Sequence, residues 1–341
     1  MYMSGFFSQF KNHLDYSRRN LVVYGRPWIE NIEPTDYCNL RCPMCVSRDP
    51  ESGYVRRGNM SVDGLRYIVE QNLDLLEGQI VWLHFNGESF LNSDLIQMIQ
   101  LLSTFGVRSR LSTNATLLNP EMSGKLFGSG LEEIVFSVDG ASKDIYQALR
   151  QGGNFEAVMH NIHHFLETKE KYGYDRPITQ VQMVVNTLNH EQVADFISYW
   201  KQTPVNWINV KKISSRAGKV VDMNLAPQGK TNKQDYPCLW PWRSMIVLAN
   251  GNVVPCCTDL TGQLVVGNAY EQNLRDIWNG EEMTDLRRRH MKGDVEGLLC
   301  ESCDDWRGYN DPFPVKLAKE IGSSIGLVKR QSKHNLIRNK R

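Results

Sequence analysis

Three cysteines lie within eight residues near the start of the sequence, at Cys38, Cys42 and Cys45. Their Cys-x3-Cys-x2-Cys spacing directly follows a predicted strand. Three thiolates can hold three irons of a cubane cluster and leave the fourth iron open to a small chelating molecule, whereas a closed structural site would want four ligands. The alternative is a zinc knuckle completed by one distant ligand, which the spacing disfavours because zinc ribbons favour paired Cys-x2-Cys motifs.

A second group of cysteines lies near the end of the sequence. Cys238 is followed after twelve residues by Gly251, and after four more by Cys256, within a predicted hairpin. Cys300 and Cys303 then form a Cys-x2-Cys pair. Four thiolates suit either zinc or a fully ligated iron-sulfur cluster, and the residues alone leave both possibilities open.

Several features of the sequence favour metal binding over disulfides for the eight cysteines. The N-terminal segment MYMSGFFSQFKNH lacks the continuous apolar stretch of a signal peptide, and no later stretch has the length of a membrane span. We therefore expect a cytoplasmic protein, in a reducing compartment where disulfides are rare. Thirty-nine basic and 38 acidic residues leave a formal charge of +1, which provides no chain-wide attraction to nucleic acid or anionic membranes.

The elements that must position these cysteines alternate between short β-branched runs and longer helical patterns. Helical spacing of apolar residues is clear at Leu65, Ile68, Val69 and Leu73. The alternation predicts an α/β fold, a partial (β/α)6 parallel TIM-like barrel whose functional residues follow the C-terminal ends of the strands. The predicted strands are Trp28–Ile32, Ile80–Phe85, Arg108–Ser112, Glu133–Val138, Thr179–Val185 and Trp207–Val210.

Other segments predict smaller parts around the barrel. Phe6, Phe7, Phe10 and Leu14 have helical spacing and are expected to cover the barrel bottom or its open side. Asn250-Gly251 predicts a hairpin between two apolar runs, and residues 274–290 predict one charged helix. The expected domains are an N-terminal helical extension at 1–27, the barrel at 28–215, a linker at 216–235, a small cysteine-rich domain at 236–310 and a solvated, disordered basic tail at 311–341.

The first cysteine loop resembles that of the radical S-adenosylmethionine (SAM) enzymes, and here it reads Asp36-Tyr37-Cys38-Asn39-Leu40-Arg41-Cys42-Pro43-Met44-Cys45. In that family the open iron chelates the methionine part of the cofactor, which is cleaved to a 5'-deoxyadenosyl radical. Asn86-Gly87-Glu88-Ser89 resembles the family's Gly-Gly-Glu-Pro loop, which holds the methionine ammonium. Ser112-Thr113-Asn114 and Ser137-Val138-Asp139-Gly140 resemble its ribose and carboxylate contacts. The resemblance covers residues 28 to 211.

The resemblance implies a set of residues that hold S-adenosylmethionine. Gly87 lets the backbone approach the cofactor, and Glu88 supplies charge complementary to its ammonium. The sequence departs from the family at Asn86 and Ser89, which replace the usual glycine and proline, and at Met44, where many members carry an aromatic residue; a thioether can still contact adenine. Arg150 is expected either to pair with a carboxylate or to lie on the surface. The full cofactor set is Met44, Asn86, Gly87, Glu88, Thr113, Asn114, Ser137, Asp139 and Arg150.

The second cysteine group resembles the twitch, or truncated SPASM, extension of this family, in which a hairpin and a helix surround one auxiliary 4Fe-4S cluster. A full SPASM domain binds two clusters and needs more cysteines. The resemblance implies that the auxiliary cluster is held by Cys238, Cys256, Cys300 and Cys303. Cys257 is left over, because neighbouring strand residues point to opposite faces. It is then a buried apolar residue, an alternative ligand, or a catalytic thiol that returns a hydrogen atom to a carbon radical.

Together these resemblances imply a radical SAM oxidoreductase with two 4Fe-4S clusters, S-adenosylmethionine and a reducing partner such as flavodoxin or ferredoxin. The single auxiliary cluster resembles that of aminocyclitol dehydrogenases of the butirosin pathway, where it accepts the substrate radical's electron as an alcohol becomes a ketone. We therefore expect a small hydroxylated substrate, either a carbohydrate or an aminocyclitol.

Three alternatives stay open at this point. A radical epimerase of the same substrate class would use Cys257 as its hydrogen donor. A peptide-modifying enzyme of the family often carries an N-terminal leader-binding domain, which the 37 residues before Cys38 do not favour. The non-enzymatic alternative is a zinc-binding interaction protein, which would be colourless where an iron-sulfur protein is brown.

Overall fold

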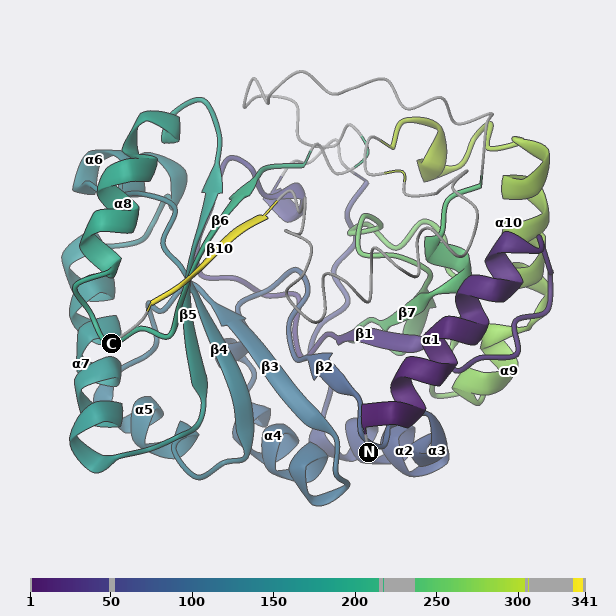
Figure 1. Ribbon diagram of the computed structural model, residues 1–341, viewed down its shortest axis with the longest axis horizontal. Helices are drawn as coiled ribbons and strands as arrows, with labels where there is room; N and C mark the ends of the chain where they lie inside the picture. The colour runs from purple at the N-terminus through teal and green to yellow at the C-terminus, as the bar shows by residue number, and fades with distance from the viewer. Residues whose placement is uncertain are drawn as a thin grey trace.

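A ten-stranded sheet forms the centre of the molecule in a computed structural model, which describes residues 2–48, 53–214, 217, 237–303, 306 and 334–339. The strand order is β10-β6-β5-β4-β3-β2-β1-β7-β8-β9 (Figure 1). The strands are β1 Trp28–Ile32, β2 Ile80–Trp82, β3 Arg108–Thr113, β4 Leu131–Ser137, β5 Ile178–Val185, β6 Trp207–Lys212, β7 Ser244–Val247, β8 Asn252–Val254, β9 Gly267–Asn268 and β10 His334–Arg338.

Strands β1 to β6 are parallel neighbours in chain order, which confirms the predicted α/β architecture of a partial barrel. All six predicted strands are present, with β2 shorter than expected. It ends at Trp82 rather than Phe85, although the Leu83 amide still donates to the Arg110 carbonyl oxygen at 2.8 Å. The residues after Leu83 leave the ladder to form the loop that contains Gly87 and Glu88.

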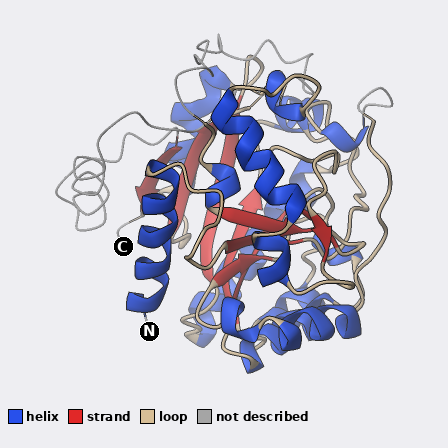
Figure 2. Ribbon diagram, turned by 90° about the vertical axis from the view of Figure 1, so that its right-hand side faces the viewer, coloured by secondary structure: helices blue, strands red, loops and turns tan. Residues whose placement is uncertain are grey.

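Helices cover the outer face of the curved sheet (Figure 2). Leu65, Ile68 and Val69 of α2 have no exposed surface and belong to the main core, as their spacing predicts. The helices are α1 Tyr2–Ser17, α2 Val62–Gln71, α3 Leu73–Leu76, α4 Leu95–Thr104, α5 Pro120–Leu126, α6 Lys143–Leu149, α7 Phe155–Tyr172, α8 Val193–Trp200, α9 Leu274–Trp278 and α10 Glu281–Lys292.

The predicted hairpin is confirmed as β7 and β8, and it joins the barrel sheet. β7 lies parallel to β1, with Trp28 opposite Ser244 and Ile32 opposite Val247, and β8 and β9 continue the sheet in antiparallel order. The cysteine-rich segment therefore extends the same sheet that carries the first cysteine loop.

The expected single helix over residues 274–290 is wrong, because the chain breaks it into α9 and α10 at Asn279-Gly280. The Asn279 side chain accepts a hydrogen bond from the Val23 amide at 2.9 Å and donates to the Val23 carbonyl oxygen at 3.1 Å. These contacts with a distant segment stabilise the turn, and Gly280 then caps α10 with extended backbone.

The expected disordered tail is wrong for residues 334–338. They form β10, which pairs antiparallel with β6 from His334 opposite Lys211 to Arg338 opposite Trp207. This pairing satisfies backbone groups that an open edge of β6 would leave exposed. Apart from Ala217 and Asn339, the predicted linker at 216–235 and the rest of the predicted tail beyond 310 lie outside the described residues.

The N-terminal helix α1 packs against the short turn Trp240–Trp242 that precedes β7, and its expected place at the barrel bottom or its open side stays a prediction (Figure 1). The Tyr16 hydroxyl donates to the Pro237 carbonyl oxygen at 2.8 Å, and its ring meets Trp242 edge-on at 5.6 Å. The side chains of Phe6 and Phe7 lie outside the described residues.

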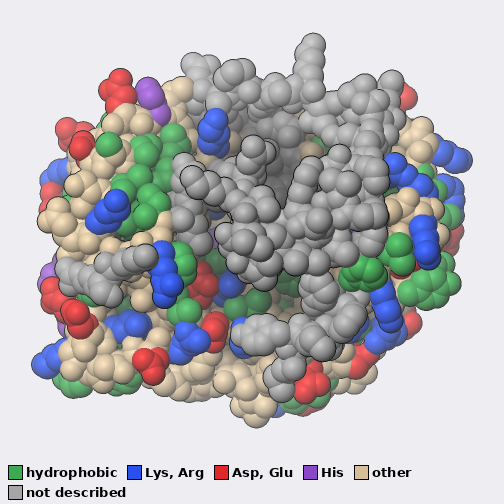
Figure 3. All heavy atoms as spheres, in the orientation of Figure 1, with side chains coloured by type: hydrophobic (Ala, Val, Ile, Leu, Met, Phe, Trp, Pro, Cys, Tyr) green, Lys and Arg blue, Asp and Glu red, His purple; other side chains and the backbone are tan. Residues whose placement is uncertain are grey.

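The surface carries no dominant sign of charge on the face shown in Figure 3, where acidic and basic side chains are interspersed. This agrees with the formal charge of +1. Within the described ranges, no helix has the length and apolar character needed to cross a membrane.

Arg287 of α10 joins several segments of the C-terminal region. Its side chain is fully buried and donates to the carbonyl oxygens of Leu21, Pro241 and Trp278 at 2.7 to 2.9 Å, and to Asn279 Oδ1 at 3.0 Å. The guanidinium also lies 4.5 Å from the Trp278 ring centroid. Burial lowers the pKa of Arg287 to about 9, against the attraction of Asp15.

Arg287→Met should lower the free energy of unfolding by roughly 3 kcal/mol, because it leaves buried carbonyl oxygens without donors. Arg288→Met is the matched control, since Arg288 lies on the same helix and makes an exposed ion pair with Asp285, which contributes less than about 1 kcal/mol. Denaturant unfolding of both variants measures the difference. Equal stability of the two variants would contradict a structural role for Arg287.

Candidate functional site

The first cysteine loop begins after β1 ends, and contacts with two other segments and one contact within the loop hold it in place. The Arg41 amide donates to the Gln151 carbonyl oxygen at 2.8 Å, and the Cys45 amide donates to the Cys42 carbonyl oxygen at 3.0 Å. The Asn39 side chain donates to Thr116 Oγ1 at 2.8 Å. The loop is thus held over the C-terminal ends of the barrel strands.

The thiols of this loop lie close enough to influence one another. The pKa of Cys38 is raised to about 11, mainly by burial and also by the nearby Glu88, Cys42 and Cys45, although a backbone hydrogen bond from Leu40 opposes the change. Burial also raises the pKa of Cys42, although the Arg150 guanidinium opposes this, with Nη1 at 3.8 Å from the sulfur. Buried thiolates need a compensating positive charge, and iron ions would supply it. The donor set therefore fits a three-thiolate cluster site.

Gly87 lies where the β2 loop presses against the cysteine loop. A Cβ atom at this position would collide with the carbonyl oxygens of Thr35 and Tyr37, so only glycine fits. The next amide, of Glu88, donates to the Tyr37 carbonyl oxygen at 2.8 Å. This close approach places Glu88 directly beside the cysteine loop.

The Glu88 carboxylate is 2% exposed and gathers residues from the next strand end. It accepts hydrogen bonds from Thr113 Oγ1 at 2.8 Å, from the Asn114 amide at 2.7 Å and from the Phe90 amide at 3.3 Å. Burial raises the pKa of Glu88, and these hydrogen bonds oppose the change. Asn114 also donates to Asn39 Oδ1 at 3.0 Å. The fold therefore brings together Glu88, Thr113 and Asn114, which the sequence placed on separate loops.

Asp139, after β4, pairs with Arg150. Asp139 Oδ1 accepts from the Val184 amide at 2.7 Å, and its Oδ2 lies 2.6 Å from Arg150 Nη2. The Arg150 side chain is only 16% exposed and is thus a carboxylate partner beside Cys42, so the surface alternative is wrong. Ser137 Oγ lies 3.3 Å from Ser112 Oγ.

Met44 lies at the other side of the cysteine loop. It is partly buried and packs with Val46 and Leu149 in a small apolar cluster. A thioether at this place forms part of an apolar wall next to the thiols, consistent with the expected contact to a planar ring.

The second cysteine group gathers in an aromatic-rich pocket of the core. Cys238, Trp240, Val295 and Trp306 form a buried cluster, against which Cys256, Cys257 and Cys300 pack. Burial raises the pKa of Cys256 strongly, and Cys257, Cys300 and Cys238 raise it further, which shows that these thiols are neighbours. The Cys303 amide donates to the Cys300 carbonyl oxygen at 3.3 Å, so one turn carries both.

Cys257 does not lie on a strand, although the sequence pattern predicted one there. β8 ends at Val254, so Cys256 and Cys257 lie in the bend after the strand, and strand alternation does not separate them. Their contacts do. Cys257 also packs against a second apolar cluster that contains Phe85 and Ile246, whereas Cys256 belongs to the first cluster alone, with Cys238, Trp240, Val295 and Trp306. Cys257 therefore lies between the auxiliary site and the end of β2.

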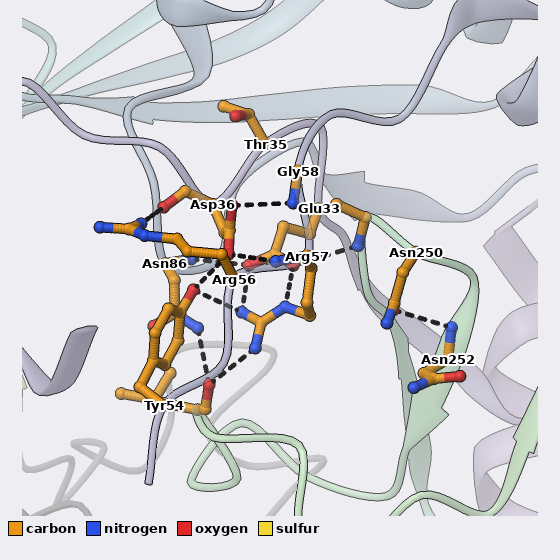
Figure 4. A network of polar contacts seen from close by, with 12 residues as sticks. Glu33, Thr35, Asp36, Tyr54, Arg56, Arg57, Gly58, Asn86, Asn250 and Asn252 are labelled. Atoms are coloured by element: carbon orange, nitrogen blue, oxygen red, sulfur yellow. Dashed lines mark hydrogen bonds and ion pairs between the residues drawn. The ribbon is translucent and has the colours of Figure 1, made fainter. Parts of the chain in front are cut away.

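A polar network that the sequence patterns did not predict lies beneath these loops (Figure 4). Glu33, immediately after β1, is fully buried and pairs with Arg57, whose Nε and Nη2 each lie 2.8 Å from a carboxylate oxygen. Tyr54 bridges Arg57 to Asp36 with distances of 2.9 and 3.0 Å. A charged residue directly after a buried strand was the available signal for Glu33.

All eight cysteines are free of disulfide bonds. Over residues 2–48, 53–214 and 237–303, no three side chains of His, Cys, Asp or Glu have the arrangement that holds a single metal ion.

Two family models match the chain. The radical SAM superfamily model matches residues 32–199, and the SPASM iron-sulfur cluster-binding domain model matches residues 238–304. The two matched segments contain the first cysteine group and the four expected auxiliary ligands, respectively.

Curated relatives share about a quarter of the aligned residues. A tungsten-containing aldehyde ferredoxin oxidoreductase cofactor-modifying protein of Pyrococcus furiosus is 24% identical over 75% of this chain and 82% of its own length. The S-adenosyl-L-methionine-dependent 2-deoxy-scyllo-inosamine dehydrogenase of Niallia circulans is 22% identical over 80% of this chain and 91% of its own.

Solved structures share the fold at lower identity. SuiB of Streptococcus suis, bound to its precursor peptide SuiA, gives a TM-score of 0.62 at 16% identity, covering 86% of this chain and 73% of its own. BtrN in complex with AdoMet and 2-DOIA gives 0.54 at 18% identity, covering 83% of this chain and 93% of its own. The parallel sheet, the two cysteine sites and the matches to both family models agree, and the chain belongs to the radical SAM superfamily as an enzyme with a SPASM-type iron-sulfur domain.

Proposed function

We propose that this enzyme removes a hydrogen atom from a small hydroxylated substrate, a carbohydrate or an aminocyclitol, and oxidises an alcohol carbon to a ketone. When bound, the cofactor and its cluster supply the radical that removes the hydrogen atom, and an auxiliary 4Fe-4S cluster accepts the remaining electron while the hydroxyl proton is lost. The Niallia circulans dehydrogenase, similar over most of both chains, supports this class of reaction.

The observation that supports this proposal is a contact between two loops. One is the auxiliary loop, residues 258–264 after Cys257, and the other is the cofactor loop, residues 86–89. The carbonyl oxygen of Leu260, three residues after Cys257, accepts hydrogen bonds from Asn86 Nδ2 at 2.8 Å and from Arg57 Nη1 at 3.3 Å. Asn86 directly precedes Gly87 and Glu88. An auxiliary cluster in this position would border the same strand ends as the cofactor, which is where an electron leaving the substrate has to go.

The polarity of the inner face of the sheet supports a hydroxylated substrate. Ser137, Gln182 and Asn209 are register neighbours on β4, β5 and β6, and Asn209 Nδ2 lies 3.5 Å from Gln182 Oε1. The residues that alternate with them are buried in the main core under the helices, namely Phe136, Val181, Met183 and Ile208. Because side chains alternate between the two faces of a strand, the polar row faces the inside of the barrel. Hydroxyl and amide groups there suit a ligand rich in hydroxyls.

The proposed cofactor site assigns a task to each loop. Gly87 allows the backbone to approach the cofactor, and Glu88 holds the methionine ammonium. Hydrogen bonds from Thr113 and Asn114 fix the Glu88 carboxylate. Ser137, Asp139, Arg150, Asn86 and Met44 complete the proposed set. Cys38, Cys42 and Cys45 would hold one cluster, and Cys238, Cys256, Cys300 and Cys303 the other.

A radical epimerase of the same substrates is the second candidate, and one observation favours it. Cys257 packs both against the auxiliary cysteines and against Phe85 in the loop after β2, which is a suitable place for a thiol that returns a hydrogen atom to a carbon radical. The product of an epimerase has the same mass as its substrate, and the reaction needs no electron acceptor.

Anaerobically reconstituted protein should contain about eight irons per chain, as two 4Fe-4S clusters. Cys42→Ala and Cys300→Ala should each lose about four irons, because each removes one ligand of a different cluster. Cys257→Ala is the matched control and should keep both clusters. Loss of iron from that variant would identify Cys257 as a ligand.

Glu88→Gln should weaken S-adenosylmethionine binding by roughly 1.5 to 3 kcal/mol, the range of a charge-assisted hydrogen bond. The substitution also replaces an acceptor that the Asn114 amide and Thr113 hydroxyl require. Equilibrium binding to the cluster-loaded protein measures the effect. Glu121→Gln, an exposed carboxylate paired with Lys125, should bind the cofactor like the wild type. Unchanged affinity in Glu88→Gln would remove Glu88 from the site.

The mass of the product distinguishes the two reactions. A dehydrogenase product is two hydrogens lighter, so Cys257→Ala should keep most turnover, while Cys303→Ala should abolish product and retain some cofactor cleavage. An epimerase product keeps its mass in water and gains one deuterium in heavy water. Mass spectrometry after turnover of an aminocyclitol substrate provides the measurement. Deuterium incorporation that Cys257→Ala abolishes would favour the epimerase.

A further inference from the structure

The buried ion pair of Glu33 and Arg57 contacts both halves of the molecule. The side chains of Glu33 and Arg57 are 0% and 5% exposed. Besides Arg57, Glu33 Oε1 accepts from the Asn86 amide at 3.3 Å, and Oε2 accepts from the Ala249 amide at 3.1 Å. Ala249 lies in the turn between β7 and β8. One carboxylate therefore holds the start of the cofactor loop and the hairpin that leads to Cys256.

Asn86 adds a second, direct connection. Its backbone amide binds Glu33, and its side-chain amide binds the Leu260 carbonyl oxygen, the same oxygen that Arg57 contacts. Figure 4 shows Asn86 and Arg57 on the same side of the network, with Tyr54 beside them. Glycine at position 86 could form the backbone bond but not the bond to Leu260. The asparagine thus has a specific contact with the auxiliary loop.

Hydrogen bonds within the auxiliary loop hold its residues together, so a displacement of Leu260 would move the whole loop. The Leu260 amide donates to the Thr258 carbonyl oxygen at 2.9 Å. Asp259, fully buried, accepts from the amides of Gln263 and Leu264 at 2.9 and 2.8 Å. These bonds close the segment 258–264 into a compact loop directly after Cys257.

We propose that Asn86 and Arg57 are positioning residues that transmit cofactor binding at Gly87-Glu88 to the auxiliary loop 258–264, and so to the Cys256-Cys257 bend. The proposal rests on the proposed cofactor role of Glu88. An ammonium bound by Glu88 fixes the loop that begins at Asn86, and Asn86 and Arg57 then hold Leu260 in place. The electron-accepting site would be set in its working position when the cofactor is present.

Hydrogen exchange of cluster-loaded protein tests this without measuring turnover. Saturating S-adenosylmethionine, without reductant, should slow amide exchange in residues 258–264 by about fivefold or more in the wild type. In Asn86→Gly at saturating cofactor, the slowing should fall below about twofold. Arg57→Lys should lose most of it too, because one ammonium cannot replace the forked contacts to Glu33 and Leu260.

Asn72 provides the matched control. It is fully buried and also joins the barrel to the C-terminal region, since its Oδ1 accepts from the Leu274 amide at 2.8 Å, but no bond connects it to the cofactor loop. Asn72→Ala should lower the thermal midpoint and keep the slowing of exchange.

Four outcomes would overturn the proposal. Cofactor binding to the wild type without slower exchange, or full slowing in Asn86→Gly, would overturn the transmission alone. If Asn72→Ala loses the slowing of amide exchange to the same extent as Asn86→Gly, general stability rather than the Asn86 contact is responsible for the slowing. A wild type that binds no S-adenosylmethionine would overturn the proposed cofactor site, and the transmission with it.

Discussion

The buried carboxylate of Glu33 is the constraint on which the arrangement of the loops depends. A charge removed from water is tolerated only where it is paired and fully hydrogen-bonded, and removal of one partner is strongly destabilising. Here the four donors come from Arg57, Asn86 and Ala249, on segments far apart in the sequence. Satisfying this one group fixes the cofactor loop and the auxiliary hairpin relative to the end of β1.

The position of β7 beside β1 explains why such a network can form. Parallel neighbours end at the same edge of a sheet, so the turn after β7 lies next to the loop after β1. The first cysteine loop follows β1, whereas Cys238 precedes β7 and Cys256, Cys300 and Cys303 come after β8. Continuity of the sheet therefore brings the turn of this hairpin, with Ala249, beside Glu33 at the end of β1.

The two faces of the barrel strands have different tasks. Phe136, Val181 and Ile208 bury their side chains under the helices, while Ser137, Gln182 and Asn209 form a polar row on the inner face. Packing against helices stabilises the sheet, and the polar row is available for recognition.

The sequence by itself determined the six parallel strands, the hairpin and the two groups of cysteines, because strand runs, turn residues and cysteine spacing are local patterns. It did not determine the break at Asn279-Gly280, the strand at 334–338 or the place of α1, since each depends on partners distant in the chain. Arg150 and Asn86 show the same limit. Whether an arginine is exposed or buried beside Cys42, and whether an asparagine reaches Leu260, depends on which loops the sheet brings together, and only the tertiary structure decides that.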